Sequence, residues 1–317
     1  MRPDRWRVCL GLGVASIVLG AATPRPAIDD PEAHLSSTLV SEIVVGPGGP
    51  AWWEVTKAGR KVYVLGVLWS YPPKAPWSQR VFEHNLRGAK TVLLPPALSS
   101  GAASVVDESL PPVDWSTVPA ATRLRIEQAA RALGKPVQRY LGRPPLVAGY
   151  LLVSDYRDSQ GLKSEALLAE ISRAIVDSRV DARNAAVIPA DRYVKALSTA
   201  TPEAGLACLE GALSEIDAGH EAMSEAVEGW AHGDVAAALK APRGMELCSF
   251  AAPGQSDLRR AAIEAQVAAI AQVLDGEPGA RPTSQYMAVT PLRSLLAEDG
   301  ILDQLRKRGY QVRAPKD

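Results

Sequence analysis

Residues 51–69, AWWEVTKAGRKVYVLGVLW, decide the fold of this chain. Two runs rich in β-branched and aromatic residues, Trp52–Thr56 and Arg60–Leu68, flank the short connector Lys57-Ala58-Gly59. Two such runs around a short connector that contains glycine predict an antiparallel hairpin. Trp69 follows the second run, at a position where a chain usually carries a turn residue or a reactive side chain. The stretch therefore predicts a sheet with one large aromatic side chain at its end.

Strands and helices are expected on both sides of this hairpin. Further strands are predicted at residues 38–45, 91–96, 286–289 and 310–312. Apolar residues at steps of three and four predict the helices. These cover residues 78–89, with Ser78 as the cap, 120–133, 163–176, 205–217, 221–231, 256–274, with Ser256 or Asp257 as the cap, and 299–308. The order indicates an α/β fold: a central mixed sheet flanked by helices, with a helical middle segment at about residues 115–275.

Size and charge limit the classes of function. The chain has 317 residues, of which 47% are apolar and 22% charged, so it is long enough for one large or two modest packed domains. Its formal net charge is zero. Because nucleic-acid recognition usually needs a basic face, no nucleic-acid partner is expected.

The N-terminus is typical of an exported protein. Three arginines precede a short apolar stretch, and Gly20 and Ala22 supply the small residues that a signal peptidase accepts. Residues 1–22 are predicted to be a signal peptide, residues 23–37 a proline-rich linker and residues 38–317 the folded domain. The apolar stretch is shorter than the roughly 20 residues of a bilayer span, although an uncleaved anchor is the alternative. We expect a periplasmic protein with no stable transmembrane segment after cleavage.

Export changes how the cysteines are interpreted. Only Cys208 and Cys248 remain after cleavage, and a pair of cysteines in an oxidising compartment favours a disulfide. Two separate buried thiols are the alternative. A bridge that closes a loop of about 40 residues should stabilise the fold by roughly 3–4 kcal/mol.

Common catalytic motifs are absent from the sequence. His220-Glu221 begins like a zinc-protease helix, but Ser224 stands where the second histidine would lie one turn on. The sequence contains no G-x-S-x-G elbow, and no serine or cysteine is marked as a nucleophile by its context. We therefore identify no catalytic or metal-binding residues and expect no cofactor.

Five segments of the chain form a recognisable series. They are WWEVTKAGRKVYVLG (52–66), AKTVLL (89–94), GLKSEALLAEISRA (161–174), EGWAHGDVAAAL (228–239) and YMAVTPLRSLLAEDGILDQLRKRGYQV (286–312). In their order and separation these segments resemble the TraB/GumN family, which is related in fold to Tiki-type and erythromycin-esterase/ChaN-like proteins. The likeness covers most of residues 38–313.

The resemblance implies a histidine after the first strand glycine, a glutamate at the end of the next strand and a histidine after the penultimate strand. Such a set could bind a divalent metal and activate water. This chain has Trp69 and Pro95 at the first two positions, and Arg293 or Ser294 at the third. Tryptophan only donates a hydrogen bond, proline has no side-chain lone pair, and arginine is a fixed cation. A metal centre cannot be built from these residues.

Three functions remain open. The first is a noncatalytic family member whose cleft at the sheet end binds a small ligand, a peptide or an envelope protein, with Trp69 and Tyr71 as stacking faces and Arg293 as a fork for an anion. The alternative, which is equally plausible from the sequence, is that Trp69 binds nothing and only fills the space of a lost metal. The second is a metal-dependent hydrolase or peptidase with unmatched ligands, and the third is a scaffold protein of the envelope.

Overall fold

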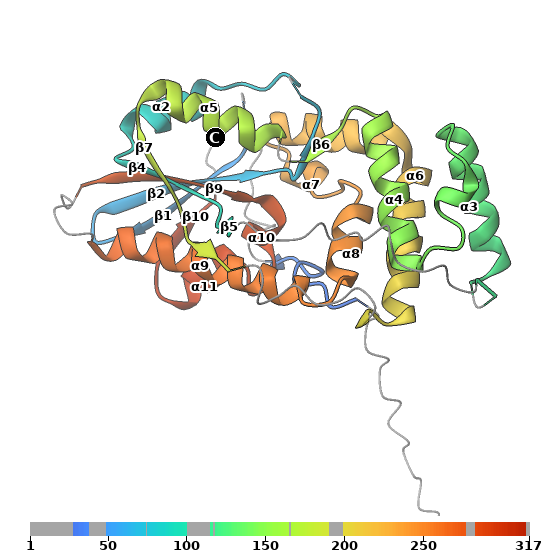
Figure 1. The fold of residues 1–317 in the computed structure, drawn as a ribbon. Coiled ribbons are helices and arrows are strands. Elements are labelled where there is room, and N and C mark those ends of the chain that lie inside the picture. Colours follow the sequence, from blue (N-terminus) through green and yellow to red (C-terminus); the bar gives the residue numbers. More distant parts are fainter. Residues whose placement is uncertain are drawn as a thin grey trace, which may run out of the picture.

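A computed structural model describes residues 28–37, 49–73, 75–99, 115–116, 118–164, 166–189, 199–276 and 283–314. At its centre lies a six-stranded sheet in the order β10-β1-β2-β9-β4-β7 (Figure 1). The strands are β1 (Trp52–Lys57), β2 (Arg60–Val67), β4 (Thr91–Leu94), β7 (Asp181–Asn184), β9 (Gln285–Pro291) and β10 (Gln311–Arg313). The predicted α/β fold with a mixed sheet is confirmed, while the signal peptide and the strand expected at residues 38–45 lie outside the described residues.

The hairpin that decides the fold is present. Strands β1 and β2 pair antiparallel, with Trp53 opposite Val64. Their connector is Ala58 and Gly59, which both have positive φ (50° and 83°). A two-residue loop of that conformation matches the twist of the flanking strands and fixes their register.

The other strands give the sheet one functional edge. Strands β2, β9, β4 and β7 run parallel to one another, so their carboxyl ends meet at one edge of the sheet. In open α/β sheets, ligands bind outside the carboxyl ends of the strands. Two further short pairs lie beyond the main sheet. They are β3 (Ser70–Tyr71) with β6 (Lys163–Ser164), and β5 (Ala97–Leu98) with β8 (Val187–Ile188).

Helices cover both faces of the sheet (Figure 1). One face carries α2 (Arg80–Gly88) and α5 (Ala166–Ser178), and the other carries α9 (Gln255–Gly276), α10 (Leu292–Leu296) and α11 (Ile301–Lys307). The strand side chains between these layers are fully buried, as Val62, Val64 and Val289 illustrate. Burial of these apolar side chains holds the helices against the two faces of the sheet.

The remaining helices form a second body beside the sheet, which we call the helical lobe (right side of Figure 1). It consists of α3 (Ala120–Ala132), the short 3₁₀ helix η1 (Val137–Arg139), α4 (Pro145–Ser159), α6 (Pro202–Ala231), α7 (Val235–Ala238) and α8 (Gly244–Ala251). Trp230 in α6 donates a 2.7 Å hydrogen bond from Nε1 to the carbonyl oxygen of Gly66, near the end of β2. The lobe is thereby attached at the carboxyl edge of the sheet. The predicted helical segment, residues 115–275, also includes α5, β7 and α9. These three elements belong to the layers of the sheet and not to the lobe.

Three local predictions differ from the structure. Residues 205–217 and 221–231 lie in the single helix α6, which is kinked at Gly219 (φ 74°). Neither predicted N-cap fills that role: α2 is preceded by Gln79, without a side-chain cap, and α9 begins at Gln255. The Ser256 hydroxyl instead donates a hydrogen bond to the backbone of the N-terminal segment, at the carbonyl oxygen of Asp29.

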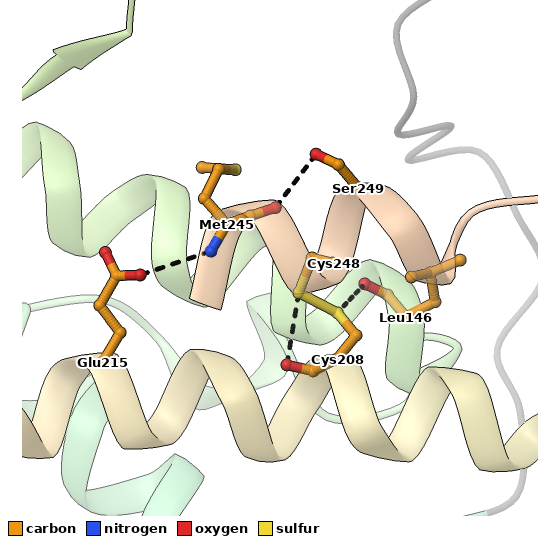
Figure 2. The surroundings of a disulfide bond; sticks show 6 residues. All are labelled: Leu146, Cys208, Glu215, Met245, Cys248 and Ser249. Carbon is orange, nitrogen blue, oxygen red and sulfur yellow. Dashed lines mark hydrogen bonds between the residues drawn. A yellow bond between two sulfur atoms is a disulfide. The ribbon is translucent and has the colours of Figure 1, made fainter. Parts of the chain in front are cut away.

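Cys208 and Cys248 join two helices of the lobe (Figure 2). Their Sγ atoms lie 2.10 Å apart, at the bonding distance of a disulfide, so the predicted pairing is confirmed in the structure. Both residues are fully buried, and Cys208 Sγ lies 3.4 Å from the carbonyl oxygen of Leu146 in α4. The bridge therefore links α6 to α8 at the point where α4 also packs.

The described part of the predicted linker, residues 28–37, is packed against the rest of the chain. We call it the leader segment. Leu35 forms a β-bridge with Ala297, and the Ser36 amide donates a 2.9 Å hydrogen bond to the Leu296 carbonyl oxygen. Asp30 accepts hydrogen bonds of 2.8 and 3.1 Å from Arg243 of the lobe. The leader thus contacts both the sheet layers and the helical lobe.

Candidate functional site

A cavity of about 530 Å³ opens at the carboxyl edge of the sheet. Residues at the ends of four parallel strands line it: Trp69 after β2, Pro95 after β4, Thr290 in β9 and Asn184 in β7. Helices α5, α8 and α9 supply most of the rest of the wall, and α10 and α11 add Ser294 and Ile301. The contributions of the first three include Leu168 and Ser172, then Met245, Ser249 and Phe250, then Leu258, Arg259, Ala262, Ile263 and Gln266. The wall is mostly apolar with a few polar groups, as in pockets that hold small ligands.

The structure brings three of the five predicted cleft residues to this cavity. Trp69, Pro95 and Ser294 line it. Trp69 is partly exposed, and the guanidinium carbon of Arg259 lies 5.6 Å from its ring centroid. The Pro95 carbonyl oxygen accepts a 2.7 Å hydrogen bond from Asn184. The three positions at which the family pattern is altered therefore lie around one cavity.

Arg293 lies outside the large cavity. Its guanidinium donates a hydrogen bond to the carbonyl oxygen of Leu239, at the end of α7. It borders a smaller cavity of about 50 Å³, which Trp69 and Glu32 also line. Burial, and then the neighbouring positive charge of Arg243, lower the pKa of Arg293. Its charge therefore faces the leader segment and the lobe.

Tyr71 belongs to the core. It is fully buried, and its ring meets that of Trp230 edge to face, with centroids 5.4 Å apart. Its hydroxyl donates a 3.4 Å hydrogen bond to the carbonyl oxygen of Ala75. Burial raises its pKa, so the hydroxyl stays neutral. Tyr71 packs the lobe against the sheet edge and is not among the residues that line the large cavity.

A buried ion pair beneath the cavity has no counterpart in the sequence analysis. Arg157 in α4, 3% exposed, donates from Nε (2.5 Å) and Nη2 (3.0 Å) to the two carboxylate oxygens of Glu215 in α6. Its Nη1 donates to the hydroxyl of Ser70 at 2.5 Å, and Nη2 lies 3.2 Å from a carboxylate oxygen of Glu246. Burial lowers the pKa of Arg157, but the carboxylates of Glu246 and Glu215 raise it by more. The guanidinium therefore stays charged. Arg157 follows the apolar run of α4 in the segment GYLLVSDYRDS (149–159), where Asp155 and Asp158 are also charged, so the sequence did not mark this arginine as buried.

A second buried carboxylate comes from the leader segment. Glu32 is 3% exposed and accepts a 2.5 Å hydrogen bond from the Ser294 hydroxyl. Its carboxylate oxygens also lie 3.6 Å from Arg259 Nε and 3.9 Å from Arg243 Nη2. Two guanidiniums and a hydroxyl therefore surround this buried carboxylate. The leader segment therefore contacts the cavity wall at Ser294.

Gln266 adds an unusual polar group to the wall. The residue is 1% exposed, and neither its Nε2 nor its Oε1 atom has a hydrogen-bond partner in the described chain. An unpaired buried polar group costs about 1–3 kcal/mol. Both amide atoms are covered, so the side chain must rotate before a ligand in the cavity can bond them. Such a rotation would satisfy the amide only when the cavity holds a polar atom or water.

Histidine does not contribute to the described wall. All four histidines, His34, His84, His220 and His232, are exposed and lie away from the cavity. Within the described ranges, no three side chains of histidine, cysteine, aspartate or glutamate come together as a metal-binding group. Among the acidic residues of the described ranges, only Glu246 lines the cavity, and it is paired with Arg157.

These features define an α/β protein with a mixed sheet, a helical lobe and a cavity at the carboxyl edge of its parallel strands. The chain belongs to the TraB/PrgY/gumN family, whose sequence model matches residues 51–314. This finding confirms the resemblance found in the sequence. No curated protein and no solved structure matches the chain. In the described part of the chain, no helix is long and apolar enough to cross a membrane.

Proposed function

We propose that this family member is an exported, noncatalytic protein that binds a small, mainly apolar ligand in the cavity at the sheet edge. One observation carries the proposal: an open cavity of about 530 Å³, large enough for a small molecule, lies between Trp69, Pro95 and Ser294. Trp69 lines this cavity and does not fill it. The unpaired amide of Gln266 in the wall adds support.

The side chains at the altered positions support a noncatalytic role. Trp69 and Pro95 offer no lone pair to a metal, and the Ser294 hydroxyl is engaged by Glu32. Catalysis of hydrolysis needs a nucleophile or an activated water beside a general base. Glu246, the one carboxylate in the described wall, is paired with Arg157 and so is poorly placed to take a proton.

The proposal of an exported, periplasmic protein rests on residues 1–22 and on the cysteine pair. A disulfide persists in an oxidising compartment and is rare in the cytosol. The Cys208–Cys248 bridge is therefore consistent with the signal peptide that the sequence predicts.

A neutral fluorescent probe tests the binding function. N-phenyl-1-naphthylamine, whose emission rises in apolar surroundings, should bind the mature protein. Ala262→Phe places a large ring into the cavity and should weaken this binding at least about tenfold, because overpacked sites exclude ligands. Ala261→Phe is the matched control, since residue 261 precedes it on α9 but is not among the lining residues. Equal binding by both variants, or none by the native protein, would contradict the proposal.

Metal analysis separates this function from the hydrolase alternative. We expect purified mature protein to hold less than about 0.1 equivalent of zinc, manganese or cobalt after dialysis, because catalytic zinc needs about three protein ligands. A stoichiometric metal that survives dialysis would overturn the noncatalytic assignment.

A further inference from the structure

Arg259 gives the cavity a preference for a ligand with a negative charge. This inference rests on the proposed binding function. The residue lies on α9 and lines both the large cavity and the smaller one. Its guanidinium carbon is 5.6 Å from the ring centroid of Trp69 and 5.7 Å from that of Phe250. Cation–π contacts at these distances hold the flat guanidinium between two aromatic faces. The group is therefore positioned before any ligand arrives.

The hydrogen-bond donors of Arg259 are available. The only ion pair of Arg259 within the described chain is the 3.6 Å approach of Nε to Glu32, which exceeds hydrogen-bond distance. No hydrogen bond joins its guanidinium to another described residue, and its side chain is 21% exposed. The neighbouring Arg243 differs, since it is bonded twice to Asp30. Arg259 thus presents a free fork at the wall of a mainly apolar cavity.

Nearby carboxylates leave this fork free. Glu32 accepts its short hydrogen bond from Ser294, and Glu246 is paired with Arg157 at 3.2 Å. The guanidinium fork matches the two oxygens of a carboxylate, and charge-assisted bonds of this kind are the strong ones. We propose that the cavity binds an apolar molecule that carries one carboxylate, with the carboxylate on Arg259 and the apolar body along Phe250 and Ile263.

Charge and length refine the ligand class. A dianion such as a phosphate monoester would meet one free guanidinium and the two carboxylates of Glu32 and Glu246, so a single negative charge fits better. Gln266 lies seven residues beyond Arg259 on α9, which corresponds to about 10 Å along the helix. An apolar body of that length would span the wall between the two polar side chains.

Calorimetric titration with three eight-carbon probes tests this class. Octanoate, 1-octanol and octylamine share one apolar body and differ in the head group. We expect octanoate to bind the mature protein at least about tenfold more tightly than 1-octanol, and octylamine to bind most weakly. Arg259→Met keeps the length of the side chain and removes the charge, so it should lower octanoate affinity to that of 1-octanol and leave 1-octanol affinity unchanged.

Two further variants control the result. Arg260→Met removes the adjacent arginine, which pairs with Asp29 and Asp257 outside the cavity, and should leave the preference for octanoate unchanged. Arg259→Lys keeps the charge without the fork and should bind octanoate several-fold more weakly than the native protein, which covers the case that Arg259→Met does not fold. Equal affinities of the native protein for octanoate and 1-octanol would refute the carboxylate and leave the binding function standing. Failure of all three probes and of the naphthylamine would refute both.

Discussion

At the residue scale, Trp69 shows what a sequence can and cannot say about a site. Its position after a predicted strand placed it at the sheet edge, and the family resemblance marked the position as altered. Its partner Arg259 lies 5.6 Å from the ring but 190 positions along the chain, on a helix whose apolar spacing indicated only a core face. Contacts of that separation depend on how whole helices dock, so local patterns do not reveal them.

The buried Arg157 makes a stability prediction at the same scale. Arg157→Met leaves Glu215 and Glu246 without their cation and should lower the free energy of unfolding by about 3–5 kcal/mol at pH 7. Urea or guanidinium unfolding measures this loss. Arg131→Met is the control, because Arg131 bonds only the backbone of its own helix in the described chain, and it should change stability by less than about 0.5 kcal/mol.

The pH dependence of that variant has a definite sign. Burial raises the pKa of Glu215, against the opposing hydrogen bond from Arg157, and Arg157→Met removes that opposition. A carboxyl group whose folded pKa lies above its unfolded pKa binds more protons when folded, so it stabilises the fold as pH falls. The deficit of Arg157→Met relative to the native protein should therefore shrink between pH 7 and pH 5. A deficit that stays constant or grows toward pH 5 would contradict this account.

At the element scale, the helices that the sequence analysis missed lack a one-sided pattern. In α4, Leu146, Val147, Leu151, Leu152 and Val153 are all buried, because α4 packs against other lobe helices on several sides. Residues 145–153 of α4 are apolar on all sides, so they show no 3.6-residue periodicity. Strand β7, with the sequence DARN, is an exposed edge strand and carries no apolar signal either. The amphipathic helices and the paired hairpin were predictable because their sequences carry a regular pattern of apolar residues.

The disulfide between α6 and α8 gives the prediction for this scale. Cys208→Ala/Cys248→Ala should lower the free energy of unfolding by about 2–5 kcal/mol, because the bridge restricts a loop of about 40 residues in the unfolded chain. Guanidinium unfolding of both proteins, with and without a reducing agent, measures the difference, and the reducing agent should affect only the native protein. Nonreducing mass spectrometry should find both cysteines in one linked peptide. Two freely alkylated thiols would contradict the bridge.

At the scale of the whole molecule, the sheet and the helical lobe meet around the candidate cavity. Strand ends supply one side of its wall, α8 of the lobe another, and α9 a third. The α/β class and the altered site positions were predictable because each depends on short stretches of chain. The cavity itself was not, since its volume depends on the angle at which the lobe docks and on side chains from many strands and helices.

The leader segment yields the last prediction, because it bridges these two bodies. Glu32 binds Ser294 of the sheet layers, while Asp30 binds Arg243 of the lobe. A chain that starts at residue 38 loses both contacts together with the Leu35 bridge and the backbone hydrogen bonds of the leader, so its free energy of unfolding should be about 2–4 kcal/mol lower than that of a chain that starts at residue 28. Glu32→Gln should reproduce about half of this loss, and Asp29→Asn, at an exposed carboxylate, should cost less than about 0.5 kcal/mol. Thermal and urea unfolding of the four proteins supply the measurement. If the two chain lengths prove equally stable, the leader rests on the surface without joining the bodies, and Glu32 has no structural role beside the cavity.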